Sequence, residues 1–188
     1  MKNRLEHELS NTPGGIDDLG ACFTSAPVGT DTEIVGNAMA YIDFSLEDPG
    51  YMKEGEYDTD IFVNISDYDP VSGDAFLFTY GQLRASMRKT GECPYDFLGL
   101  PWHPAEEKDR QPLELHKRYE LEIDIMPTGY VLKKGHCLRV TITNTMQAAY
   151  YLGFKEYGED PNVARPVINI YTGGENGSRV ILPNIYKY

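Results

Sequence analysis

The stretch YELEIDI, residues 119–125, alternates apolar and acidic side chains at every position. Successive side chains of a β-strand point to opposite faces of the sheet, so this period of two predicts a half-buried strand. The apolar half of the pattern faces a core and the acidic half faces solvent. Pro127-Thr128-Gly129 follows and supplies the turn residues that end a strand.

Shorter segments on both sides of this stretch repeat the pattern. Residues 60–68 alternate, and residues 75–80 form an apolar run. Asp69-Pro70 and a Ser-Gly-Asp turn separate the two segments, which predicts a hairpin. Residues 83–88 fit a short strand or a turn. Further predicted strands are residues 130–132, 138–142, 167–171 and 179–182.

Two further details follow from the same pattern. Residues 33–46 alternate throughout, which predicts one strand with Asn37, Asp43 and Ser45 on its outward face. Asn176-Gly177 lies between the last two predicted strands and suits the tight turn of a hairpin. With about eight short strands, frequent turn residues and no long helix, the chain is predicted to be an all-β antiparallel sandwich or barrel.

The organisation of the chain is predicted to be simple. Residues 1–20 are polar and turn at Pro13-Gly14-Gly15, so we expect an N-terminal arm rather than a core element. Residues 21–188 form one domain, large enough to bury roughly 70% of its unfolded surface without disulfides or a metal. Residues 90–112 show no periodicity and contain four prolines and the only tryptophan. A loop of this length in a compact domain is usually functional or disordered.

Charge and hydropathy exclude several classes of partner. The net charge is −12, and no run of basic residues offers a face for phosphates, so binding to nucleic acid or an anionic membrane is not expected. No segment reaches the about 18 apolar residues of a membrane span. The acidic balance mainly supports solubility.

The cellular location of the protein is inferred from its cysteines and its N-terminal residues. Cys22, Cys93 and Cys137 are far apart and form no CxxC or CxxH pattern, so free thiols in a reducing compartment are expected. Residues 1–10 are charged and lack the apolar stretch of a signal peptide. A cytoplasmic location is therefore predicted, although a domain cut from a longer secreted protein would look the same.

Several segments resemble, in order, the motifs of one known family. They are CFTSAP and DTEIVG (22–27, 31–36), DTD and SDYDP (58–60, 66–70), GQLRASMR (81–88), PLE, YELEID and PTGY (112–114, 119–124, 127–130), KKGH and LRV (133–136, 138–140) and SRVILP (178–183). The family is the C-terminal domain of X-Pro dipeptidyl-peptidases, cocaine esterase and α-amino-acid ester hydrolases. The resemblance implies a galactose-binding-like jelly roll of two antiparallel sheets, packed on an α/β-hydrolase domain.

The family's catalytic serine lies in a G-x-S-x-G elbow, with its acid and histidine partners later in the chain. This sequence has no G-x-S-x-G, and it lacks the roughly 250 residues that a hydrolase domain needs. The resemblance places the whole triad in that other domain. We therefore predict no catalytic residue and no cofactor in this chain.

The histidines and the clustered aspartates are interpreted as structural residues and not as catalytic or metal-binding ones. His136 and Cys137 cannot form a dyad along a strand, because adjacent side chains point to opposite faces. The four histidines, His7, His103, His116 and His136, are interpreted as turn or surface residues. Calcium binds clustered carboxylates, but the aspartates at the ends of the predicted hairpin match no EF-hand spacing and are interpreted as turn formers, with no metal site. They are Asp58, Asp60, Asp67, Asp69 and Asp74.

Six residues are candidate contacts to a partner domain or ligand. Rigid aromatic side chains on loops make good interface anchors, and they also stack on sugars. The long loop carries Tyr95, Phe97, Trp102 and His103, and the arm carries Ile16 and Leu19. We interpret the loop residues as interface or packing residues.

These observations favour a non-catalytic accessory domain that stabilises an α/β-hydrolase domain and shapes substrate access. Two other functions remain open: a free-standing carbohydrate-binding module, and one subunit of a hydrolase split into two chains. Jelly rolls host many sugar binders, but a fold alone does not assign function. Self-association is also left open.

Overall fold

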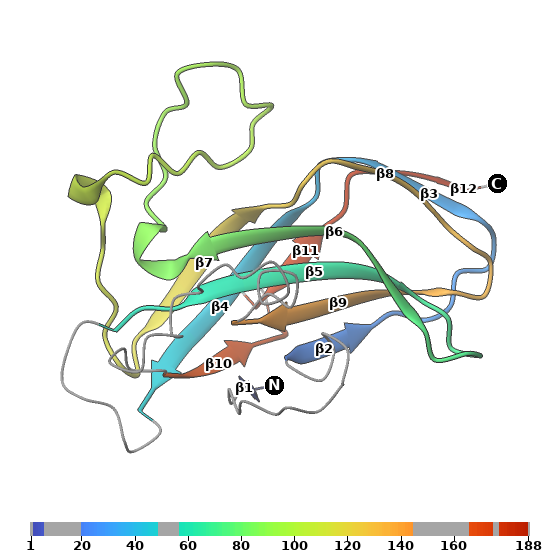
Figure 1. The fold of residues 1–188 in the computed structure, drawn as a ribbon, viewed down its shortest axis with the longest axis horizontal. Helices are drawn as coiled ribbons and strands as arrows, with labels where there is room; N and C mark the ends of the chain where they lie inside the picture. The colour runs from blue at the N-terminus through green and yellow to red at the C-terminus, as the bar shows by residue number, and fades with distance from the viewer. Residues whose placement is uncertain (1, 6–19, 49–56, 145–165, 175–176, 188) are drawn as a thin grey trace, which may run out of the picture.

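The computed structural model describes residues 2–5, 20–48, 57–144, 166–174 and 177–187. Within these ranges the chain is all-β, as predicted, and every named strand pair is antiparallel (Figure 1). The strands are β1 (Lys2–Leu5), β2 (Ala21–Thr24), β3 (Thr32–Gly36), β4 (Met39–Glu47), β5 (Asp60–Tyr68), β6 (Ala75–Arg84), β7 (Arg118–Asp124), β8 (Thr128–Leu132), β9 (Cys137–Thr143), β10 (Val167–Tyr171), β11 (Arg179–Ile181) and β12 (Asn184–Lys187).

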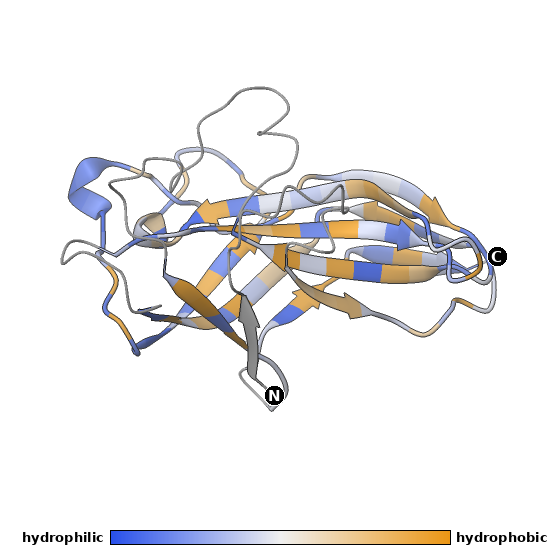
Figure 2. Cartoon of the chain, turned by 60° about the horizontal axis from the view of Figure 1, so that its bottom comes forward, coloured by the Kyte–Doolittle hydropathy of each residue, from blue (hydrophilic) through white to orange (hydrophobic). Residues whose placement is uncertain are grey.

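Two sheets face each other as a sandwich. Sheet I contains β1, β10, β4 and β11, with β7 on the other side of β4; sheet II has the order β2-β9-β5-β6. A smaller sheet, β12-β3-β8, continues three strands of sheet I, because β3 leads into β4, β7 into β8 and β11 into β12. This arrangement is the predicted jelly-roll sandwich. Apolar and polar residues alternate along the strands in Figure 2.

The junction between β3 and β4 is a bend that the alternation of residues 33–46 does not reveal. The predicted single strand is wrong: it is broken at 37–38 into β3 and β4. Gly36 has φ +120°, a conformation that glycine adopts without strain, and an added Cβ would lie 3.1 Å from the Cβ of Pro183. The bend therefore depends on a contact between residues far apart in sequence.

The last two strands of sheet I do not form the predicted hairpin. Val167–Ile170 pair with residues 47–44 of β4, and Arg179–Ile181 pair with residues 41–39 of the same strand. Because β7 occupies the opposite side of β4 at both positions, β10 and β11 lie in line along one edge. They occupy one edge of β4 like two halves of an interrupted strand, and the described residues 172–174 and 177–178 lie between the halves.

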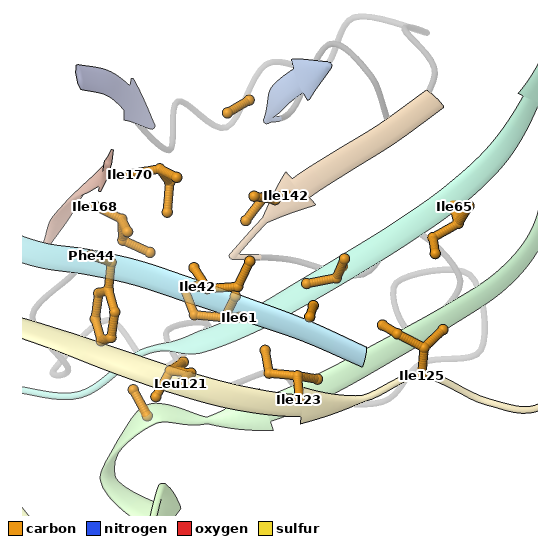
Figure 3. Close-up of a cluster of buried hydrophobic side chains, with 14 of the residues drawn as sticks. Ile42, Phe44, Ile61, Ile65, Leu121, Ile123, Ile125, Ile142, Ile168 and Ile170 are labelled. Atoms are coloured by element: carbon orange, nitrogen blue, oxygen red, sulfur yellow. The ribbon is translucent and has the colours of Figure 1, made fainter. Parts of the chain in front are cut away.

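The core lies between the inner faces of sheets I and II (Figure 3). Ile42 and Phe44 of β4 and Leu121 and Ile123 of β7 are all 1% exposed or less. The predicted inward face of residues 119–125 is thus confirmed. Burying such a side chain contributes about 1.5–3 kcal/mol, so this cluster is the main source of stability.

The outward face of β4 is buried as well, contrary to the prediction for Asp43 and Ser45, which are 6% and 2% exposed. The guanidinium of Arg118 donates to both carboxylate oxygens of Asp43 and lies 4.2 Å above the ring centre of Tyr171. The hydroxyls of Tyr171 and Ser45 are 2.9 Å apart. A long cationic side chain from the neighbouring strand thus covers polar residues that alternation alone places in water.

Only part of the predicted N-terminal arm can be compared with the structure. Lys2–Leu5 form β1 and pair with β10, whereas residues 6–19 lie outside the described residues. The division into an arm of residues 1–20 and a domain of residues 21–188 stays a prediction. In the described part of the chain, no helix combines the length and apolar character that a membrane crossing requires.

The bend at Gly36 gives a testable expectation. Gly36→Ala forces a strained φ and pushes a methyl group towards Pro183, so the free energy of unfolding should fall by about 1–3 kcal/mol. Gly29→Ala is the matched control, because nothing lies within 4 Å of its added Cβ. Urea unfolding of both variants makes the comparison. Equal stability of Gly36→Ala and wild type would contradict the described bend.

Candidate interaction surface

The long loop after β6 projects from one end of the sandwich. β6 ends at Arg84, a 3₁₀ turn follows at Ala85–Met87, and the chain then leaves the body of the sandwich before returning towards β7 (Figure 1). We call residues 90–105 the aromatic loop. The irregular structure predicted for this segment is confirmed.

Three aromatic rings of the loop pack on one another. The ring centres of Tyr95 and Trp102, and of Phe97 and Trp102, are 5.5 Å apart, and those of Tyr95 and Phe97 are 6.1 Å apart. All three pairs meet edge to face, the arrangement that the aromatic quadrupole favours. The structure thus brings together three of the predicted contact residues.

The tip of the loop remains open to solvent. Leu98 is 75% exposed and Tyr95 is 57% exposed. Leu98 has φ +56°, and the Oδ1 atom of Asp96 accepts a hydrogen bond from its backbone N–H at 2.9 Å. An aspartate that bonds to the backbone two residues on stabilises a tight turn. Sequence analysis missed Leu98, although Asp96 and Gly99 on either side mark such a turn.

The neck of the loop is fastened to the sandwich. The N–H of Gly91 donates to the carbonyl oxygen of Trp102 at 2.9 Å. The imidazole of His103 has Nε2 at 2.8 Å from the carbonyl oxygen of Glu122 in β7, and Nδ1 at 3.2 Å from that of Lys89. His103 therefore holds the neck instead of contributing to the exposed tip.

A buried carboxylate fixes the turn from which the loop departs. Asp58 is 3% exposed, and its Oδ1 accepts from the backbone N–H groups of Thr59 and Ser86, both at 2.9 Å. Its Oδ2 accepts from the Ser86 hydroxyl at 2.5 Å. These bonds join the segment just before β5 to the 3₁₀ turn after β6.

Further polar contacts reinforce the same base. Arg84 donates through Nε and Nη2 to the two carboxylate oxygens of Asp60, both at 2.9 Å, a bidentate pair across the end of the β5–β6 hairpin. The ammonium of Lys89 is paired with the carboxylate of Asp109. The aromatic loop is therefore presented on a rigid support.

At the other end of the hairpin, aspartates lie in turns. Asp69 Oδ1 accepts from the Val71 N–H at 2.8 Å, and this bond is the main cause that lowers the pKa of Asp69. Asp74 donates its N–H to the Ser72 hydroxyl at 3.1 Å. Among the residues that the structure describes, no group of three or more potential metal ligands gathers.

Asp67 forms a separate polar cluster. Its Oδ2 accepts from the Tyr130 hydroxyl at 2.9 Å, and its Oδ1 lies 2.7 Å from Nδ1 of His136. The Tyr130 ring stacks on Phe78, with ring centres 4.2 Å apart. Burial first, and then the bond to Asp67, raise the pKa of Tyr130 to about 12.

The structure does not place every candidate. Ile16 and Leu19 lie outside the described residues. Tyr95, Phe97 and Trp102 meet in one cluster, and His103 lies at its neck. Their contact with a partner stays a prediction.

Comparison with known proteins assigns this fold to one family. The family described as X-Pro dipeptidyl-peptidase C-terminal non-catalytic domain matches residues 15–181, which confirms the resemblance drawn from the motifs. Two curated mycobacterial proteins, from Mycobacterium bovis and Mycobacterium tuberculosis, have names that refer to a serine esterase. Each is 27% identical over 164 residues, which cover 87% of this chain and 23% of the relative. The chain thus spans about a quarter of the length of these curated relatives.

Solved structures share the fold. A CocE/NonD family hydrolase of Staphylococcus aureus aligns with TM-score 0.70 and 23% identity, over 97% of this chain and 32% of that one. An α-amino acid ester hydrolase aligns with TM-score 0.62 and 16% identity, over 95% of this chain and 27% of that one. In both cases the similar region is the smaller part of a hydrolase chain.

The Asp58 contacts give the first expectation for this surface. Asp58→Ala leaves the Ser86 hydroxyl and N–H buried without their acceptor, so the free energy of unfolding should fall by about 3 kcal/mol. The emission of Trp102 should also change, because the loop loses part of its base. Asp74→Ala, at an exposed position, is the control and should change stability by less than about 0.5 kcal/mol. An Asp58→Ala protein as stable as the control would contradict the proposed role of this carboxylate.

The raised pKa of Tyr130 predicts a specific alkaline profile. An unfolded tyrosine titrates near pH 10, whereas the folded-state pKa of Tyr130 is about 12. The contribution of the protonated phenol to stability is therefore complete below pH 10 and is lost as pH rises from 10 to 12. Tyr130→Phe should lower the free energy of unfolding by about 1 kcal/mol at pH 8 and flatten its fall above pH 10. Denaturant unfolding between pH 8 and pH 12 measures this free energy, and Tyr186→Phe, at an exposed position, is the control. If the free energy of unfolding falls equally steeply with pH in wild type and Tyr130→Phe, the expectation is wrong.

Proposed function

Because this chain belongs to the family of X-Pro dipeptidyl-peptidase C-terminal non-catalytic domains, we propose that it is the accessory domain of a larger serine hydrolase. In this proposal it docks on the α/β-hydrolase domain through the aromatic loop, stabilises that domain and shapes substrate access. The parent activity is ester, acyl or dipeptidyl hydrolysis. The names of the curated relatives and of the similar structures support this class of reaction.

One observation supports the docking role above all others: an apolar tip on a rigid base. Tyr95 and Leu98 are more than half exposed, while hydrogen bonds and an ion pair hold the segments beneath them. Aromatic side chains dominate the binding energy of interfaces, and a loop already ordered in the free protein loses little entropy when it binds. Both properties suit a docking surface.

The carbohydrate-binding alternative has weaker support. Sugar rings stack on flat, accessible aromatic faces, whereas the three rings of the loop meet one another edge to face. The split-hydrolase alternative differs from the main proposal only in whether the hydrolase domain is on the same polypeptide. A cytoplasmic setting is also proposed, and the three unpaired cysteines are compatible with it.

Activity of the isolated chain separates an accessory domain from an enzyme. The purified 188-residue protein should hydrolyse neither X-Pro-nitroanilides nor simple esters above the buffer rate. Adding the hydrolase polypeptide from the same source, whether encoded in the same or a neighbouring reading frame, should restore hydrolysis. Robust turnover by the chain alone would contradict the proposal.

The docking surface itself is tested by a double variant. Tyr95→Ser with Leu98→Ser removes the exposed apolar tip, so affinity for that hydrolase polypeptide should fall at least about tenfold, since truncated interface anchors cost roughly 2 kcal/mol or more. Val71→Ser is the control, because Val71 is 93% exposed on the turn between β5 and β6. Calorimetric titration measures the affinities, and unfolding curves check that both variants stay folded. If the double variant loses no more affinity for the hydrolase polypeptide than Val71→Ser does, docking lies elsewhere. Binding to a glycan array that disappears in Tyr95→Ser would instead favour the carbohydrate-binding module.

A further inference from the structure

An apolar hollow of about 250 Å³ lies between the sheets, where β2 and β9 of sheet II face β4 and β11 of sheet I. Most of its lining is apolar: Phe23, Ile42, Val140, Ile142 and Val180. Thr172, Ser178 and Arg179 complete the lining, and the Ser178 hydroxyl already donates to the carbonyl oxygen of Asp43 at 3.2 Å. Two of these residues, Ile42 and Ile142, are labelled on the facing sheets in Figure 3. The hollow is partly open at the surface, and it interrupts the dense packing that is normal between facing sheets, so it needs a structural cause.

The cause is the interruption between β10 and β11. Ile170 pairs with Phe44, and Arg179 pairs with Tyr41, so only two residues of β4, Ile42 and Asp43, lie opposite the eight residues 171–178 of the neighbouring strand. The extra residues leave the ladder, and we call those that the structure describes, 172–174 and 177–178, the excursion. The inner wall therefore lacks the side chain that an unbroken strand would supply next to Ile42.

The excursion is a built wall and not a loose connection. The backbone N–H of Asp43 donates to the Ser178 hydroxyl at 2.9 Å, and the Ser178 N–H donates to the Tyr171 carbonyl oxygen at 2.8 Å. Gly177 packs against Gly173 so closely that an added Cβ would lie 2.3 Å from its carbonyl oxygen. These contacts oppose the movement of the strands that would close the hollow.

The chemistry of the hollow selects an uncharged ligand. Arg179 borders it, but the guanidinium lies 3.9 Å above the ring centre of Tyr41 and 3.4 Å from a carboxylate oxygen of Glu120. Val180 packs against the core and lines the hollow, whereas Ile181, the next residue of β11, is 52% exposed and is not part of the lining. A charged group placed among these aliphatic side chains would lose its hydration without a partner.

We propose that the hollow is a binding site for a small uncharged apolar molecule, of up to about two fused rings. A dry apolar cavity of about 150 Å³ accepts benzene, so a volume of about 250 Å³ accommodates a larger ring system. The site lies between the sheets and not on the aromatic loop, and the proposal does not rest on docking to a hydrolase domain.

Indole and purine are matched probes for this site, because they share a two-ring shape and differ in polarity. Indole, added to the full 188-residue chain, should shift the methyl NMR signals of Val140, Ile142 and Val180 in a saturable manner. Purine should bind at least about tenfold more weakly, because its ring nitrogens lose water without gaining partners. Absence of saturable shifts with indole, or equal binding of the two probes, would overturn the proposal.

Neighbouring residues on β11 supply the matched variants. Val180→Phe fills the hollow and should weaken indole binding at least about tenfold. Ile181→Phe, on the outward and 52% exposed side of the same strand, should leave binding unchanged. If Val180→Phe does not give a cooperative unfolding transition, Val180→Met, which fills the hollow in part, decides the matter. Unchanged binding in the folded filling variant would refute the site.

Discussion

The hydrogen bonds of Asp58 are the interaction on which the functional surface depends. A buried carboxylate must find donors within the protein, and Asp58 finds them in Thr59 and Ser86. Thr59 directly precedes β5, and Ser86 lies in the 3₁₀ turn that follows β6. The carboxylate thus joins the β5–β6 hairpin, at the edge of sheet II, to the origin of the aromatic loop. Stability of the sandwich and presentation of the loop are coupled through it.

Much of the fold could be predicted from local sequence because apolar and polar side chains alternate every two residues along a half-buried strand. Residues 119–125 show this repeat at every position, and Ile61, Val63 and Ile65 show it in the middle of residues 60–68; β7 and β5 lie there. The bend at Gly36 escaped prediction because alternation continues across it, and the contact that requires glycine comes from Pro183. Local pattern carries no information about a corner that a distant residue sets.

Long-range pairing also explains the other differences. Asn176-Gly177 suits a hairpin turn, yet β10 and β11 both pair with β4, which fixes them in line. Asp43 belongs to the outward face that alternation assigns, but Arg118 covers it. For the candidate surface, the clustering of aromatic residues in one loop was predictable. The role of His103 was not, because its hydrogen-bond acceptors are backbone carbonyl groups, one of them on β7.

In the proposed assembly, the tip of the aromatic loop contacts the hydrolase domain. Hydroxyl-radical footprinting compares the oxidation of Tyr95 and Leu98 in the isolated chain with that in the assembled hydrolase. We expect both residues to become protected on assembly, while Val71 and Phe76 at the far end of the hairpin stay as reactive as before. Unchanged oxidation of Tyr95 and Leu98, with protection at Val71 and Phe76, would contradict the proposed assembly.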